Sequence, residues 1–242
     1  MGKHALISGG GSGIGLAIAT RLSGLGYRVA LLGRDRAKLE KAAAGLSAKA
    51  SEPPLFESCD VADRGSVQKA VSRVLETFGS IDVLVCNAGV NVKNRSLATL
   101  TPEDWDLQIA TNLTGAFNVV YYVLPSMRER KSGLIVQICS VSGIRASVLG
   151  GTAYSASKFG QSALGICIGR EERVNGIRSS VIYPGEVETP ILENRPVAVG
   201  AERRSQILQP EDVAAAVGFL VELPPRATVP ELVITPAVDD FG

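Results

Sequence analysis

The sequence predicts an α/β fold of the doubly wound type, in which a seven-stranded parallel sheet carries helices on both faces. Short apolar runs alternate with longer segments of helical spacing along the whole chain, which is the pattern of successive βαβ units. A glycine-rich turn also joins the first apolar run to the first helical segment. Together these observations indicate parallel strands that are buried on both sides.

The candidate strands cover residues 4–8, 28–32, 55–59, 83–86, 134–138, 178–183 and 232–234. Helices are predicted over residues 14–25, 36–50, 64–78, 103–130, 152–174 and 210–222. The helix at 103–130 has a well-defined start, because Thr101 is a capping residue and Pro102 suits the first helical position. No repeat or linker divides the chain, so residues 1–242 are predicted to form a single domain.

The composition argues against several classes of partner. The 25 basic and 24 acidic side chains leave a formal charge of +1, so no overall field attracts nucleic acid or an anionic membrane. A small neutral or singly charged molecule fits better. Neither a secretory signal nor a long apolar span is visible, and we therefore expect a cytoplasmic protein.

Cysteine and histidine usage gives no sign of a metal site. The four cysteines form no C-x-x-C pair and are expected to be buried free thiols in a reducing compartment; they are Cys59, Cys86, Cys139 and Cys167. The one histidine, His4, begins the first strand and is interpreted as structural. We therefore predict no metal ligands.

The glycine-rich turn occupies residues 8–15. Glycine permits positive φ and close backbone approach, while the start of the following helix offers unpaired N–H groups to a pyrophosphate. Its position after a strand and before a helix favours a Rossmann-type dinucleotide site over a plain flexible turn. The expected contacts are Ser8, Gly9, Gly11, Ser12, Gly13, Ile14 and Gly15.

The spacing S-G-x-x-x-G-x-G in this turn resembles the short-chain dehydrogenase/reductase family, with Ser8 where that family usually has threonine. The resemblance continues across nearly the whole chain. Its further pieces are Asp60-Val61, Asn87-Ala88-Gly89, Asn112, Ser140, Tyr154-x-x-x-Lys158 and Pro184-Gly185. Each piece is common by itself, but their order and their positions relative to the strands are specific.

The resemblance implies contacts along a bound dinucleotide. Asp60, followed by Val61, would bind the adenine amino group, and the backbone of Asn87, Ala88 and Gly89 would follow the adenosine ribose. After the turn at Pro184 and Gly185, Val187 and Thr189 would hold the nicotinamide carboxamide. A helix cap is the alternative for Asp60, and a strand-ending turn is the alternative for residues 87–89.

The end of the second strand indicates which nicotinamide cofactor binds. Gly33 stands where NAD-dependent relatives usually carry Asp, and Arg34 follows it. An arginine here accommodates the 2′-phosphate of NADP(H). Asp35 and the non-basic Ser12 keep NAD(H) as an alternative, and Arg34 and Arg36 could instead solvate a helix start.

Tyr154 and Lys158 are four residues apart and share one helix face. A nearby ammonium and an oxidised nicotinamide ring favour phenolate and lower the phenol's pKa. Tyr154 then serves as acid in carbonyl reduction and as base in alcohol oxidation. The resemblance implies that Lys158 also binds the nicotinamide ribose, that Ser140 holds the substrate oxygen, and that Asn112 kinks its helix and holds a water; an ordinary polar helix residue is the alternative for Asn112.

The spacing within this set departs from the family in one place. Ser140 precedes Tyr154 by 14 residues, one more than is usual, and the pair Gly150-Gly151 would absorb the insertion. Ser142 is therefore the alternative as the serine that orients the substrate.

Residues 188–209 are the least regular stretch and are expected to form a substrate lid, with a mobile surface connection as the alternative. Arg203 and Arg204 are expected on a solvated helix face, with contact to an acidic substrate as the alternative. The segments at 103–130 and 152–174 carry excess apolar surface, and the resemblance implies a homodimer or homotetramer. A thicker monomer core is the other interpretation.

The expected function is reversible hydride transfer between NADP(H) and a small-molecule carbonyl or secondary alcohol substrate. One alternative is a non-catalytic NADPH-binding sensor, which has no need for Asn112, Ser140, Tyr154 and Lys158 together. The other is a related epimerase or dehydratase, which we expect to need more sequence after Gly242.

Overall fold

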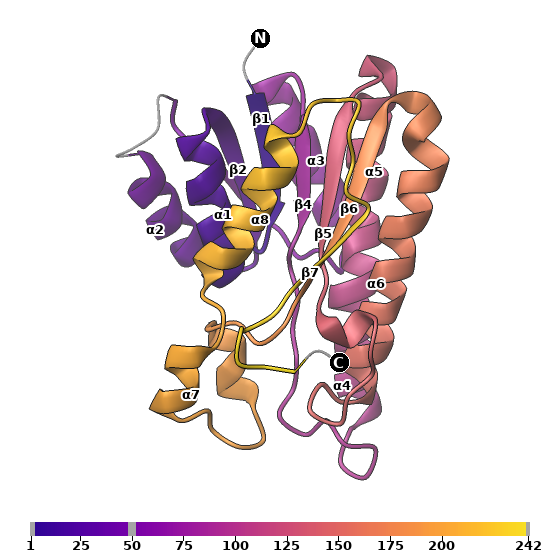
Figure 1. The fold of residues 1–242 in the computed structure, drawn as a ribbon. Helices are drawn as coiled ribbons and strands as arrows, with labels where there is room; N and C mark the ends of the chain where they lie inside the picture. Colours follow the sequence, from indigo (N-terminus) through magenta and orange to yellow (C-terminus); the bar gives the residue numbers. More distant parts are fainter. Residues whose placement is uncertain (1–2, 48–51, 241–242) are drawn as a thin grey trace.

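A computed structural model describes residues 3–47 and 52–240. Its sheet has seven strands, all parallel, in the order β3-β2-β1-β4-β5-β6-β7 (Figure 1). The strands are β1 (Lys3–Ser8), β2 (Tyr27–Gly33), β3 (Leu55–Ser58), β4 (Val83–Cys86), β5 (Gly133–Ile138), β6 (Ile177–Pro184) and β7 (Glu231–Ile234). Every strand predicted from the sequence is present, which confirms the predicted fold class.

Helices cover both faces of the sheet (Figure 1). One face carries α1 (Gly13–Gly24), α2 (Arg36–Ser47) and α8 (Pro210–Glu222), and the other carries α3 (Arg64–Phe78), α5 (Gly115–Arg130) and α6 (Thr152–Glu171). Ala5 and Ile7 of β1 face the first group while Leu6 faces the second, as the two-residue period of a strand requires. The predicted continuation of α2 through residues 48–50 lies outside the described residues.

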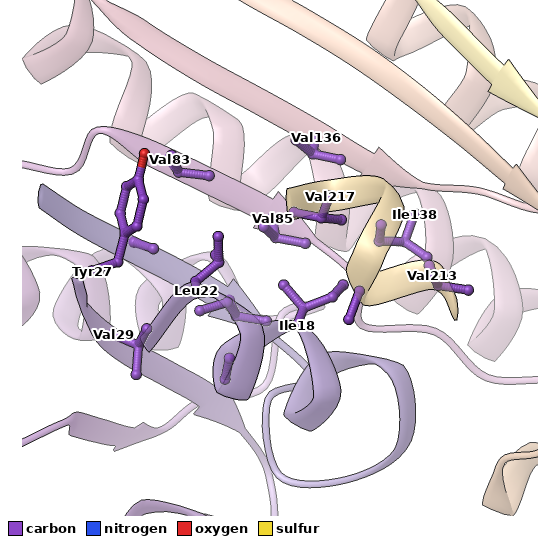
Figure 2. Packing of buried hydrophobic residues seen from close by; sticks show 14 of the residues in the cluster. Ile18, Leu22, Tyr27, Val29, Val83, Val85, Val136, Ile138, Val213 and Val217 are labelled. Carbon is purple, nitrogen blue, oxygen red and sulfur yellow. The ribbon is translucent and has the colours of Figure 1, made fainter. Parts of the chain in front are cut away.

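The core beneath α1 and α8 fixes the end of the sheet where the glycine turn lies. Ile18 and Leu22 of α1 pack with Val213 and Val217 of α8 against the strands (Figure 2). All four side chains are fully buried. Because α1 packs against both the sheet and α8, its N-terminus is held at the carboxyl edge of β1.

The prediction of one continuous helix over residues 103–130 is wrong in the middle of that range. It consists of α4 (Pro102–Gln108), a π-helical segment η1 (Ile109–Thr114) and α5. Asn112, fully buried in η1, bonds the backbone of Val90 through both atoms of its amide. The chain widens locally where this side chain is held, as at other π-bulges near functional sites. The helix predicted over 152–174 likewise ends earlier, and its last residues form the 3-10 turn η3 (Glu172–Asn175).

The predicted lid is more regular than the sequence indicated. It contains the 3-10 turn η4 (Pro190–Asn194) and the short helix α7 (Ala201–Gln206). Its base is closed by a parallel bridge between Val187 and Leu208, with Leu208 donating its N–H to Glu186 O at 3.0 Å. Figure 1 shows α7 at the carboxyl end of the sheet.

Ion pairs hold the lid, and they correct the expectation that Arg203 and Arg204 lie on a solvated face. Arg203 pairs with Glu186 at 2.9 Å and with Asp239 at 2.7 Å, and Arg204 pairs with Glu188. These partners were not predicted from the sequence, because they lie up to 36 residues away from the arginines along the chain. The lid is therefore tied both to its own base and to the segment after β7.

One cysteine prediction is wrong. Cys59, Cys86 and Cys139 are buried free thiols, but Cys167 is exposed on α6. Its neighbour Ile168 turns inward instead, because only one side of α6 faces the sheet. Among the described residues no helix is long and apolar enough to cross a membrane.

Candidate active site

A cleft of about 700 Å³ follows the carboxyl ends of the central strands. Its walls bring together most residues predicted from the sequence, including Gly9, Ser12, Gly13, Ile14, Asn87, Ala88, Gly89, Ser140, Ser142, Tyr154, Lys158, Pro184, Gly185, Val187 and Thr189. A narrower extension of about 190 Å³ runs beside the end of β2 and is lined by Gly11, Gly33, Arg34, Asp35, Lys38, Asp60 and Val61. Open α/β sheets bind ligands at this edge.

The glycine turn is shaped to receive a pyrophosphate. Gly9 and Gly13 have φ values of +67° and +51°, which favour glycine. A Cβ on Gly15 would lie 2.2 Å from the carbonyl oxygen of Gly9, so the turn packs too closely for any side chain. The side chain of Ser12, at the N-cap of α1, makes no capping hydrogen bond. This turn therefore fits the phosphates of a dinucleotide.

A set of hydrogen bonds joins β1 to the segment after β4. The Ser8 hydroxyl accepts the N–H groups of Asn87 and Ala88 at 3.0 and 3.1 Å. In return, Asn87 Nδ2 donates to the carbonyl oxygens of Ser8 and Gly9 at 3.1 and 3.2 Å. The retained hydroxyl at position 8 thus positions residues 87–89 along the cleft.

The narrow extension presents cations at the end of β2. Asp35 is turned toward α2, where its Oδ1 accepts the N–H of Lys38 at 3.1 Å. Arg36 pairs with Glu40 at 3.0 Å. Arg34 lines the narrow extension together with Lys38. Lys38 was not predicted from the sequence. The Asp35 carboxylate, which kept NAD(H) as an alternative cofactor, therefore caps α2 through Oδ1, and its Oδ2 lies 3.6 Å from Lys38 Nζ.

The carboxyl group of Asp60 stabilises a turn by accepting the N–H of Ala62 at 3.0 Å. The helix cap that was the alternative role belongs to Asp63, which accepts the N–H of Ser66 at 2.7 Å. Asp60 lies beside Val61 in the narrow extension.

Tyr154, Ser140 and Lys158 converge in the wide part of the cleft. Ser140 and Tyr154 line the same cleft, and hydrogen bonding by the Ser140 side chain acts to lower the pKa of the Tyr154 phenol. Ser142 instead donates its backbone N–H to Ser140 Oγ at 3.1 Å. Lys158 Nζ lies 5.7 Å from the centroid of the Tyr154 ring. The Ser140 side chain acts on the Tyr154 phenol and that of Ser142 does not, which favours Ser140 over Ser142 as the partner of Tyr154.

Burial raises the pKa of Tyr154 to about 12. The hydrogen bond from Ser140 and the positive charges of Arg95 and Arg195 act in the opposite direction. Burial also lowers the pKa of Lys158. The predicted lowering of the phenol's pKa by Lys158 together with an oxidised nicotinamide ring stays a prediction, and neither arginine was predicted from the sequence.

Asn112 reaches the helix that carries Tyr154. Its Nδ2 donates to Ser157 Oγ at 3.0 Å, and Ser157 donates in turn to the carbonyl oxygen of Tyr154 at 2.8 Å. Asn112 thus links the π-helical segment to the first turn of α6.

A buried amide network holds the lysine. Lys158 Nζ donates to Gln161 Oε1 at 2.8 Å and to the Ile138 carbonyl oxygen at 3.0 Å. Gln161 Nε2 donates to Gln137 Oε1 at 3.1 Å. Both glutamines are fully buried, and neither belongs to a motif that the sequence reading used. Gln161 could have been found as a polar residue one helical turn after Lys158 on a helix that packs against the sheet.

The turn after β6 lies over the glycine turn. The Thr189 side chain faces Gly13, whose added Cβ would meet Thr189 Cγ2 at 3.3 Å. Val187 is fixed by its bridge to Leu208, and Gly185 donates its N–H to the Ile234 carbonyl oxygen at 2.8 Å. These residues close the cleft from the side of the lid.

The parallel fold, the glycine turn and the tyrosine-lysine helix together define a nicotinamide-dependent oxidoreductase of the Rossmann type. Comparison with known proteins agrees: the model of the short chain dehydrogenase family matches residues 3–198. The protein belongs to the short-chain dehydrogenase/reductase family.

Individual relatives cover nearly the whole chain. The acetoacetyl-CoA reductase of Shinella zoogloeoides is 34% identical, with 91% of each chain covered. The structure of a variant of the actinorhodin polyketide ketoreductase with NADPH is 32% identical, covers 98% of this chain and 97% of its own, and gives a TM-score of 0.89. The alcohol dehydrogenase of the archaeon Thermococcus sibiricus, complexed with 5-hydroxy-NADP, is 30% identical, with 98% of each chain covered and a TM-score of 0.87.

Proposed function

We propose that the protein transfers a hydride reversibly between NADP(H) and a small carbonyl compound or secondary alcohol. The observation that carries this proposal is that Ser140, Tyr154 and Lys158 line the same cleft that begins at the glycine turn. A nucleotide-binding sensor would need the turn but not these three residues together. The relatives that are named as reductases support the same reading.

Bound NADPH supplies the hydride, and the protein supplies the proton. Tyr154 is a neutral phenol at neutral pH, because burial raises its pKa to about 12, and it therefore holds the proton that a reduced carbonyl oxygen accepts. Ser140 orients that oxygen where negative charge develops. In the oxidative direction, the positive nicotinamide ring favours the phenolate that the reaction needs.

Lys158 lines the cleft with its Nζ already held by two acceptors. An ammonium has three N–H donors, and we assign the remaining one to the nicotinamide ribose. Asn112, whose two amide N–H groups are donated to Val90 and Ser157, is assigned to holding η1 against α6.

The cofactor would lie from the narrow extension to the turn after β6. Residues 8–15 would hold its pyrophosphate, and residues 87–89 its adenosine ribose. Asp60 and Val61 would bind the adenine, and residues 184–189 the carboxamide. Arg34 and Lys38 supply the charges for a 2′-phosphate, so we propose NADP(H) as the preferred cofactor; two relatives are named in complex with NADPH or an NADP derivative.

We further propose that the protein is a homodimer. Large apolar side chains are exposed on α4, α5 and α6, namely Trp105, Leu107, Phe117, Tyr121 and Phe159. Such a gathering on one face of a protein is typical of a protein contact.

The test is a screen of aldehydes and ketones with the purified protein, run separately with NADPH and NADH and followed by nicotinamide absorbance. We expect oxidation of the cofactor with at least one carbonyl, and faster with NADPH. Tight cofactor binding without turnover of any carbonyl would point to the sensor instead.

A further inference from the structure

Arg95 is a buried arginine at the rim of the cleft, with 7% of its surface exposed. Its Nε donates to the Val92 carbonyl oxygen and its Nη1 to that of Leu149, both at 2.9 Å. Its Nη2 donates to the carbonyl oxygen of Asn194 in η4. The side chain therefore joins three segments that meet beside the catalytic tyrosine.

The charge of Arg95 has no counter-charge within the part of the chain that the structure describes. The nearby Arg195 pairs with Glu186 at 2.6 Å, and Arg203 pairs with Glu186 and Asp239, but no carboxylate lies within ion-pair distance of Arg95. Burying an unpaired charge is costly. A guanidinium has five N–H donors, and the three hydrogen bonds of Arg95 use one on each nitrogen, which leaves one N–H on each terminal nitrogen.

Arg95 does not lie at the adenosine end of the cofactor site. Arg95 lines the wide part of the cleft with Asn91, Leu149 and Tyr154, and it is absent from the narrow extension beside Arg34. Its positive charge acts on the Tyr154 phenol and lowers that phenol's pKa. Because Arg95 and Tyr154 line the same part of the cleft, an anion paired with Arg95 would lie on the side of the cleft that holds the tyrosine.

We propose that the substrate itself supplies this counter-charge: the protein reduces carbonyl compounds that carry an anionic group, a carboxylate or a phosphate, which Arg95 binds beside Tyr154. The two terminal N–H groups suit either anion, since both accept paired hydrogen bonds from a guanidinium. This inference rests on the proposed reductase function.

The first experiment uses the unaltered protein and matched substrate pairs. The carboxylate arm compares 2-oxo-, 3-oxo- and 4-oxopentanoate with their methyl esters, and the phosphate arm compares dihydroxyacetone phosphate with dihydroxyacetone. We expect one anion to exceed its neutral counterpart in kcat/KM by about 10- to 100-fold, through KM, as a charged hydrogen bond provides. The arm that shows the preference identifies the anion.

The second experiment replaces Arg95. Arg95→Gln should reduce the ratio of kcat/KM for the preferred anion to kcat/KM for its neutral counterpart to about one, because the variant keeps no charge that distinguishes the two substrates. Lys93→Gln is the matched control, because it removes an exposed positive charge two residues away and should change neither value.

Three results would overturn the inference. One is equal turnover of every anion and its neutral counterpart, which needs no variant and so stands even if Arg95→Gln does not fold. Another is an equal loss on both members of a pair in Arg95→Gln, which would mean that Arg95 only holds the three segments or acts on Tyr154. The third is an anion preference that survives in Arg95→Gln. Absence of turnover with all neutral and anionic carbonyls would instead refute the proposed reductase function.

Discussion

Arg34 and Asp35 are adjacent in the sequence but take different roles in the structure. The carboxylate of Asp35 accepts the backbone N–H of Lys38, while Arg34 lines the narrow extension with the side chain of Lys38. The sequence predicted Arg34 from its place after β2. It could not predict Lys38, because that contact depends on how α2 begins.

Cofactor preference follows from this pair of cations. Arg34→Gln should weaken NADPH binding about 10- to 100-fold and change NADH binding little, since only NADPH carries the 2′-phosphate. Arg36→Gln is the matched control, because Arg36 pairs with Glu40 instead. Titration of both cofactors by fluorescence measures the effect; an equal loss for NADPH and NADH would contradict it.

The state of Tyr154 sets the pH dependence. Burial raises the pKa of its phenol to about 12, so the proton stays on the oxygen throughout the neutral range. Carbonyl reduction, which uses that proton, should be nearly independent of pH from about pH 6 to 8. Alcohol oxidation needs the phenolate and should therefore rise with pH. Initial rates in both directions test this, and an oxidation rate that falls from about pH 7 to 9 would be inconsistent with it.

Motifs in the sequence predicted the residues that we assign to the reacting groups, but not those that support them. Tyr154, Ser140 and Lys158 stand at recognisable spacings. Gln161 and Arg95 do not, and their roles depend on contacts with β5 and with the lid. Such contacts arise only when the strands are placed side by side, which is why spacing along the chain did not show them.

At the scale of elements, type and number were predictable while local irregularities were not. The apolar periodicity on either side of Asn112 is helical, and it predicted one helix where the structure has α4, η1 and α5. The π-helical segment η1 does not interrupt this apolar periodicity, so the pattern contained no sign of it. Similarly, the prolines of the lid predicted an irregular segment and not η4 and α7. The position of α7 depends on ion pairs between Arg203 and residues outside the lid.

The glycine turn is the element whose geometry is most demanding. In Gly15→Ala the new Cβ would lie 2.2 Å from the carbonyl oxygen of Gly9, so the turn must move away from its pyrophosphate-binding shape. We expect NADPH affinity to fall at least about tenfold. Gly24→Ala at the other end of α1 meets no atom within 4 Å and should bind NADPH normally. Unchanged affinity in a folded Gly15→Ala protein would refute this role.

At the scale of the whole molecule, the sequence predicted seven parallel strands, but the structure was needed for their order. That order places β1 beside β4 and so brings the glycine turn and residues 87–89 to one edge. Strands far apart in the chain become neighbours through crossover connections. The composition of a single segment does not predict the direction of its crossover.

The apolar face of α4, α5 and α6 allows a test of assembly. Tyr121 on α5 is 59% exposed, and Phe219 on the opposite face of the sheet is 47% exposed. Tyr121→Glu should convert the dimer to a monomer, because a buried unpaired carboxylate disfavours association, whereas Phe219→Glu should not. Light scattering after size exclusion measures the mass; a monomeric unaltered protein would contradict the proposal.

The most direct test of the account is single-turnover hydride transfer in Tyr154→Phe, with NADPH bound and a carbonyl that the unaltered protein reduces. The variant removes one oxygen atom, so NADPH binding should stay within about threefold while the transfer rate falls at least about 100-fold. Tyr121→Phe, which loses a phenol outside the cleft, should react at the normal rate. A Tyr154→Phe protein that binds NADPH and transfers hydride as fast as the unaltered protein would contradict the central claim that Tyr154 moves the proton.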